Sequence, residues 1–210
     1  GLLLPSSLLA KRIAWKVKGK LQNQHIMGLL RQKYGTSALT GVEVRLKGSY
    51  KITKKKWGPY GSWGTTRSRS DGTFYFNKKK NKKARRFKVE VKFEDKKLEV
   101  KKSGWITVYD SSKSHKGPSV NLGTLKFASG ARGNLGKRTP RTQADVWVAS
   151  HMLIKKMARY GYPFKSKLKV RYPSNTIAKD KVESSYANPA TQVINLFRAK
   201  DGKRDHGNVR

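Results

Sequence analysis

The side chains that most often carry chemistry in proteins are few in this sequence. It contains four histidines, no cysteine, and 12 Asp and Glu residues. No histidine lies within four residues of another, so the close ligand spacing typical of zinc sites is missing. His151 falls on an apolar helix face, where a core histidine is more common than a ligand, and Asp205-His206 is only a weak candidate pair. The sequence therefore predicts no catalytic residue, no metal site, no cofactor and no enzyme.

The carboxylates are scattered along the chain apart from one cluster, whose surroundings do not favour acid–base catalysis. Glu94, Asp95 and Glu99 lie among five lysines: Lys92, Lys96, Lys97, Lys101 and Lys102. Neutralisation of a lysine-rich segment explains them better than a catalytic pair. No nucleophile-elbow motif supports a Ser-His-Asp triad, and the glycines of residues 130–136 lack the spacing of a dinucleotide-binding loop.

Basic residues dominate the composition. The chain has 49 Lys and Arg residues and a formal net charge of +37. A small domain needs a net charge of only about 2–8 for solubility, so the excess predicts a polyanionic partner, with phosphate-rich polymers as the first candidates. Hydrophobic residues still make up 36% of the chain, which is enough for a folded core.

The basic residues are concentrated in runs. Between residues 78 and 88, eight of eleven are Lys or Arg. A single run of this kind is usually a solvated loop, but several runs with few acids between them favour phosphate binding without base specificity. The predicted nucleic-acid contacts are Lys54, Lys55, Lys56, Arg67, Arg69, Lys78, Lys79, Lys80, Lys82, Lys83, Arg85, Arg86, Arg132, Lys137, Arg138, Arg141, Lys165 and Lys167, with residues 78–88 expected to form a lysine-rich hairpin.

An aromatic residue followed by glycine recurs every three residues after the lysines at 54–56. Trp57, Tyr60 and Trp63 could stack on bases of single-stranded nucleic acid, at roughly 1–3 kcal/mol per base. Packing of these rings on the sandwich is favoured over base stacking, and contact with another copy of the chain is a further alternative. Residues 1–10 form an apolar arm with five leucines, which predicts docking on the core or on another copy, and hence a homo-oligomer.

Period-two alternation of apolar and polar residues predicts the elements that carry these groups. It indicates strands near residues 13–17, 42–46, 74–76, 87–93, 105–109 and 121–127, separated by turns. The predicted fold is mainly β: an antiparallel β-sandwich over residues 11–127, a linker over 128–138, and a small α+β unit over 139–210. In that unit, Thr139 and Pro140 suit a helix start, Gly161 and Pro163 its end, and strands follow at 168–172 and 192–197.

The first part of the chain resembles a known β-sandwich family. Residues 41–46 read Gly-Val-Glu-Val-Arg-Leu, residues 63–66 read Trp-Gly-Thr-Thr, and residues 70–76 read Ser-Asp-Gly-Thr-Phe-Tyr-Phe. This order is similar to that of transthyretin-like, or carboxypeptidase-regulatory-like, sandwiches, and the resemblance covers about residues 12–127. It implies a β-sandwich in which a Gly-Val-x-Val-x-Leu strand is followed by a hairpin, with a tight turn at Asp71-Gly72.

Residues from 139 onward resemble the leading part of secreted zinc-metallopeptidase-like domains. The resemblance rests on a helix with Asp-Val-Trp-Val-Ala at 145–149 and a strand with Lys-Val-Arg-Tyr-Pro at 169–173. The sequence has no His-Glu-x-x-His motif, so the family's zinc ligands and general base have no counterpart here. The resemblance implies a truncated or repurposed relative with a binding role.

Three functions follow from these observations. The favoured one is a non-enzymatic protein that coats or condenses nucleic acid, with DNA preferred, little sequence specificity, and assembly along it. The alternatives are an extracellular structural or filament protein that binds acidic polysaccharide or envelope, and an inactive metallopeptidase-related fragment. No apolar run approaches the roughly 20 residues of a transmembrane segment. The expected location is extracellular, otherwise nucleoid-associated; the absence of an initial Met fits a removed signal peptide, a tag scar or an incomplete start.

Overall fold

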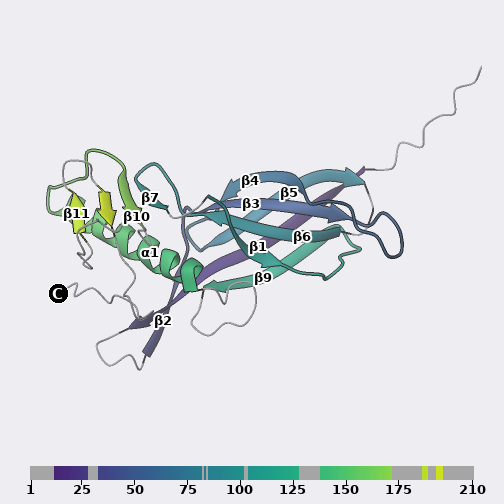
Figure 1. Ribbon diagram of the computed structural model, residues 1–210, viewed down its shortest axis with the longest axis horizontal. Coiled ribbons are helices and arrows are strands. Elements are labelled where there is room, and N and C mark those ends of the chain that lie inside the picture. Colours follow the sequence, from purple (N-terminus) through teal and green to yellow (C-terminus); the bar gives the residue numbers. More distant parts are fainter. Residues whose placement is uncertain are drawn as a thin grey trace, which may run out of the picture.

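The computed structural model describes residues 12–27, 33–81, 83, 85–101, 104–127, 138–171, 186–188 and 193–195. These residues form strands packed into sheets, together with one helix (Figure 1). The elements are β1 Arg12–Met27, β2 Lys33–Ala38, β3 Glu43–Tyr50, β4 Gly61–Arg67, β5 Thr73–Asn81, β6 Arg85–Lys92, β7 Leu98–Lys101, β8 Ile106–Asp110, β9 Ser119–Phe127, α1 Arg138–Arg159, β10 Leu168–Arg171, β11 Tyr186–Asn188 and β12 Val193–Asn195. The prediction of a mainly β fold is confirmed.

The long strand β1 organises the first sheet. Its residues 12–20 pair antiparallel with β5, and its residues 22–27 pair antiparallel with β2. Its other edge pairs with β9 in parallel orientation, with an irregularity between Lys18 and Lys20. The sandwich is therefore not wholly antiparallel: β1 and β9 are far apart in sequence, so no hairpin forces them to run in opposite directions.

The second sheet has the order β4-β3-β6-β8, and all of its pairs are antiparallel. Strand β6 illustrates why it forms, because Phe87, Val89 and Val91 alternate with charged residues and are fully buried. The two sheets meet through aromatic rings. Trp15 of β1 lies 6.3 Å from Trp63 of β4 and 6.0 Å from Phe87, between ring centroids. These edge-on contacts join the two layers into one core.

The turn between β4 and β5 was predicted from Asp71-Gly72. Gly72 has a φ of +81°, and a Cβ there would lie 2.4 Å from the carbonyl oxygen of Leu21. The Asp71 carboxylate accepts hydrogen bonds from the backbone N–H and the hydroxyl of Thr73, at 2.9 and 2.7 Å. The turn therefore requires glycine both for its backbone conformation and for its close approach to β1.

Helix α1 packs against one end of the sandwich (Figure 1). It begins at Arg138, one residue before the predicted cap Thr139. Its buried face carries Trp147, whose ring lies 5.9 Å from that of Phe93 and whose Nε1–H donates to the carbonyl of Thr40. At its end, Gly161 has a φ of +81°, Tyr162 N–H donates to Met157, and Gly161 N–H donates to Ala158. This is the hydrogen-bond pattern of a Schellman cap, and it agrees with the predicted helix end.

A third sheet crosses the predicted boundary between the two parts of the chain. Its order is β11-β12-β10-β7, and β7 pairs in parallel with β10. Because β7 belongs to the region predicted as sandwich, the sheet pairing does not divide the chain at residues 128–138. The predicted arm at residues 1–10 and most of that linker, residues 128–137, lie outside the described residues. No helix in the described part is both long and apolar enough to span a membrane.

Candidate polyanion-binding face

The basic run at residues 78–88 lies at the end of the sandwich opposite to α1 (Figure 1). It leaves the first sheet as the end of β5 and enters the second sheet as the start of β6. It is therefore not a hairpin within one sheet, as the sequence suggested, but a crossing between the two layers. Basic residues therefore lie at this end in both sheets, on β5 in the first and on β6 in the second.

Lysines replace apolar residues on the inner face of β5 near this end. Phe74 and Phe76 point into the core, and Lys78 and Lys80 continue the same period-two face. The Lys80 ammonium lies 5.9 Å from the Trp63 ring centroid, and the Lys78 side chain reaches over Gly64 of β4. The apolar core therefore ends in a layer of ammonium groups.

Arg85 was predicted as a phosphate contact, but it is only 4% exposed. Its position shares the inner face of β6 with Phe87, which explains the burial. Its guanidinium carbon lies 5.4, 5.5 and 6.0 Å from the ring centroids of Tyr50, Trp63 and Trp15. Burial lowers its pKa, and Nη2 donates to the side-chain and backbone oxygens of Asn81. Arg85 therefore stabilises this end from inside, through cation–π contacts, and does not lie on its surface.

The aromatic–glycine segment packs on the sandwich, one of the alternatives that the sequence left open. Trp63 belongs to β4 and is 5% exposed, so its ring cannot stack on a base without opening the core. Trp57 and Tyr60 are half-buried on the outer side of the second sheet. The Arg86 guanidinium lies 4.0 Å from the Trp57 ring centroid, and the Lys88 ammonium lies 5.0 Å from that of Tyr60. Each of these two rings thus has one face occupied by a cation.

The loop before Trp57 presents three further lysines. Lys51 pairs with Trp57 across the loop, and Ile52 N–H donates to the carbonyl of Lys56 at 2.9 Å. The Thr53 hydroxyl accepts from the Lys56 N–H at 3.0 Å. These bonds close the loop tightly, and they leave Lys54, Lys55 and Lys56 exposed at its tip.

Together these cations define a surface that we call the basic end. It consists of Lys54, Lys55, Lys56, Lys78, Lys79, Lys80, Lys83, Arg86 and Lys88. Among the described residues, Lys88 alone of these nine forms an ion pair, with Asp110 at 2.9 Å. The Tyr60 hydroxyl lies 3.3 Å from the same carboxylate, and burial together with Asp110 raises the Tyr60 pKa. The basic end therefore keeps an almost uncompensated positive charge.

The acids near other cations are used within the fold. Glu90, 7% exposed, accepts from Arg45 Nε at 2.7 Å and from Lys47 at 3.0 Å. Burial alone would raise the Glu90 pKa, but the hydrogen bonds from Lys47 and Arg45 outweigh it and lower the pKa. This buried carboxylate neutralises two cations of the second sheet, and it has no part in the basic end.

The remaining predicted contacts do not join the basic end. Arg67 donates to the backbone carbonyls of Gly41 and Glu94, at 2.9 and 2.6 Å, near the α1 end. Arg69 is exposed beside the β4–β5 turn, and Lys165 and Lys167 lie beside α1. Lys82, Arg132 and Lys137 lie outside the described residues, as do the side chains of Arg138 and Arg141 in the first turn of α1.

The histidines that can be described have packing roles. His151 lies against Trp147, with ring centroids 4.5 Å apart, and its Nε2 is 3.1 Å from Asp95 Oδ2, although out of line for a hydrogen bond. His115 packs on Phe87 at 5.7 Å. Within the described ranges, no three potential metal ligands gather. His206 and the side chain of His25 are outside those ranges.

Three residues that contact cations at this end were not predicted from the sequence: Tyr50 beside Lys83, Asn81 beside Arg85, and Asp110 beside Lys88. The parity of Lys80 and Arg85 with neighbouring phenylalanines was a signal that these two side chains lie on the inner faces of their strands. Nothing in the sequence indicated which ring each cation would meet.

In comparisons with known proteins, no family model, no curated protein and no solved structure matches this chain. The resemblances to transthyretin-like sandwiches and to metallopeptidase-like domains therefore stay predictions.

Proposed function

We propose that this protein is a non-enzymatic polyanion-binding protein that attaches to nucleic acid, preferably DNA, through the basic end and with little sequence specificity. The observation that carries the proposal is the group of nine cations of which, among the described residues, one alone has a carboxylate partner. A charge of this density attracts condensed phosphates, because binding releases the counterions of both partners.

The side-chain chemistry supports phosphate contact rather than base reading. Eight of the nine cations are lysines, which act as mobile point charges and lack the planar fork that recognises guanine. Trp63 is buried, and Trp57 and Tyr60 each hold a cation on one ring face. The energy of binding should therefore come from phosphates, with base stacking as a minor contribution.

The number of phosphates follows from the exposed lysines. Six of them are exposed at the basic end: Lys54, Lys55, Lys56, Lys78, Lys79 and Lys83. If each neutralises one phosphate of duplex DNA, log K falls against log salt with a slope of about −5. A rise from about 50 to 200 mM salt then weakens binding roughly 10³-fold.

The test compares three variants of equal charge by fluorescence anisotropy with a 20-base-pair duplex, across a salt series. Lys54, Lys55 and Lys56 are changed to Gln in the first, and Lys78, Lys79 and Lys83 in the second. Each should reduce the salt slope by about 3. The control changes Lys126, Lys156 and Lys169, which are exposed elsewhere, and it should keep the wild-type slope. If all three variants lose DNA affinity and salt slope equally, binding depends on the overall charge of the protein and not on the basic end.

The same series with single-stranded DNA and heparin distinguishes the kind of polyanion. Duplex affinity that persists in the presence of heparin near 150 mM salt supports a nucleic-acid partner. Tighter binding to heparin, lost at modest salt, would overturn it in favour of an acidic polysaccharide. Assembly of copies along the polymer, and an extracellular location, stay predictions, since the apolar arm at residues 1–10 lies outside the described part.

A further inference from the structure

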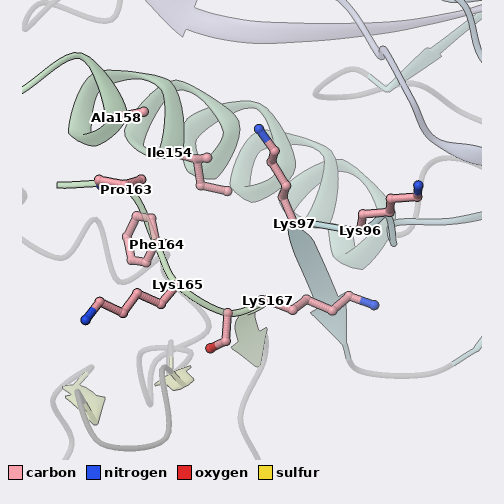
Figure 2. Close-up of a pocket in the computed structure, with 9 residues that line it drawn as sticks. Lys96, Lys97, Ile154, Ala158, Pro163, Phe164, Lys165 and Lys167 are labelled. Carbon is pink, nitrogen blue, oxygen red and sulfur yellow. The ribbon is translucent and has the colours of Figure 1, made fainter. Parts of the chain in front are cut away.

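A cavity of about 320 Å³ lies at the other end of the molecule, beside the last turns of α1 (Figure 2). Its apolar side is formed by Ile154 and Ala158 of the helix and by Phe164 in the segment that leads to β10. In Figure 2 the side chains of Ile154 and Ala158 face this segment across the cavity. Its volume is at the lower end of the range for small-molecule sites.

The walls of the cavity are held by backbone hydrogen bonds, so the site exists before any ligand binds. Leu168 N–H donates to the carbonyl of Lys97 at 2.9 Å, which ties the segment before β10 to the turn before β7. Asp95 Oδ1 accepts from the backbone N–H groups of Lys97 and Leu98, at 2.7 and 2.8 Å. The cap at Gly161 ends the helix and reverses the chain, so that the following residues lie beside the last turns of α1 and form another wall.

Four lysines surround this apolar floor, and three of them form no ion pair within the part of the chain that the structure describes. Lys167 donates to Glu94 at 2.6 Å, a bond that, with a second from Lys92, lowers the Glu94 pKa to about 2. Lys96, Lys97 and Lys165 form no ion pair with any described carboxylate. Their stems border the cavity, and their ammonium groups spread around its rim in different directions (Figure 2).

We propose that this cavity binds a small organic anion that carries one aromatic ring, such as an aryl phosphate or aryl carboxylate. The ring would be buried against Ile154, Ala158 and Phe164, which removes apolar surface of both partners from water. The anionic group would stay at the rim, within reach of the flexible ammonium groups of Lys96, Lys97 and Lys165. An inorganic anion would use only the rim, and a neutral ring only the floor.

The site is separate from the basic end, which lies at the far end of the long axis (Figure 1). The inference therefore does not depend on the proposed nucleic-acid function. A variant that fills the cavity should bind DNA with wild-type affinity. Variants of the basic end should bind the small anion in the cavity with wild-type affinity.

The experiment is a titration of the full chain with phenyl phosphate, inorganic phosphate and phenol, followed by ¹H–¹⁵N NMR. We expect saturable shifts at the backbone N–H groups of residues 96–97, 154–158 and 164–167. Phenyl phosphate should bind at least about tenfold more tightly than either fragment, a difference of about 1.4 kcal/mol. Equal affinity for phenyl phosphate and inorganic phosphate, or shifts spread over the whole surface, would overturn the proposal.

Variants test the two halves of the site. Ala158→Leu places extra methyl groups in the cavity at an exposed helix position where Leu is well tolerated, and should weaken phenyl phosphate at least about tenfold. Lys165→Gln should weaken it about threefold through the loss of one rim charge. Lys156→Gln removes a lysine of the same helix that does not line the cavity, and should change nothing. Unchanged binding in Ala158→Leu, or an equal loss in Lys156→Gln, would refute the assignment.

Discussion

Substitution of Gly48 by alanine should strongly destabilise the sandwich, although glycine to alanine is the smallest possible enlargement. Gly48 lies on the inner face of β3, in line with the buried Val44 and Leu46. A Cβ at this position would lie 2.4 Å from Nε1 and 2.5 Å from Cε2 of Trp63. Favourable contacts between such atoms occur near 3.5–4.0 Å, so the overlap is about 1 Å.

Trp63 cannot retreat from this overlap. Its ring lies edge-on to Phe87 at 5.1 Å and to Trp15 at 6.3 Å, and both of these rings are fully buried. Overpacking of a core costs about 1–3 kcal/mol, and a site enclosed by two rings belongs at the upper end of that range. We therefore expect Gly48→Ala to lower the free energy of unfolding by about 3 kcal/mol, which corresponds to a Tm lower by roughly 6–12 °C.

The matched control is Gly61→Ala on the neighbouring strand. Gly61 is the register partner of Gly48 in β4, and no heavy atom lies within 4 Å of a Cβ built there. This variant should be neutral or stabilised by up to about 1 kcal/mol, because alanine restricts the unfolded chain. Urea unfolding followed by tryptophan fluorescence measures both variants.

A double mutant separates the clash from other effects of the substitution. In the Trp63→Leu background the ring is gone, so the additional Gly48→Ala change should cost less than about 0.5 kcal/mol. If Gly48→Ala is as stable as wild type, or if its cost persists without the Trp63 ring, the reasoning about this contact is refuted.

Two further predictions concern pH. Because the Glu94 pKa is lowered from 4.5 to about 2 by Lys167 and Lys92, its contribution is present above pH 4.5 and is lost as pH falls toward 2. Glu94→Gln should therefore destabilise the protein by about 1 kcal/mol at pH 7, a value reduced for its partial exposure, and by much less near pH 2; an equal cost at both pH values in urea unfolding would contradict this. Burial lowers the pKa of His115 and of His151, so both bind a proton less readily in the fold than in the unfolded chain. Stability should fall as pH drops below about 6.5, and the fall between pH 7.5 and 5.5 should be smaller in His115→Gln; a wild-type Tm that is constant over this interval would exclude it.

Local patterns in the sequence were sufficient for most of the elements. Alternation predicted the cores of β1, β3, β5, β6, β8 and β9, because one side of each strand must be apolar to be buried. The end of α1 followed from Gly161, and the β4–β5 turn from Asp71-Gly72. Alternation did not predict β2, β4, β7 and β11. Lys33–Ala38 and Gly61–Arg67 have few apolar residues, and Leu98–Lys101 and Tyr186–Asn188 are only four and three residues long.

The sequence predicted a cationic surface, but it did not predict correctly which residues form that surface. The charge of the chain and the run at residues 78–88 indicated a cationic surface, and part of that run does form the basic end. Arg85 nevertheless turned inward, and Arg67 and Lys167 lie at the other end. The location of each side chain depends on which sheet its strand joins, and this pairing cannot be predicted from the neighbouring residues in the sequence.

Strands with one apolar face and a strongly positive surface could both be predicted, because both properties depend on local residue order and composition. The tertiary structure was needed to show that β7 pairs with β10, about 70 residues away, and so closes one wall of the lysine-rimmed cavity. It was also needed to show that the cations of β5 and β6 contact the rings of residues 50–63 at one end of the sandwich. Both outcomes arise from long-range burial of apolar faces, a property of how the elements fit together rather than of any one segment.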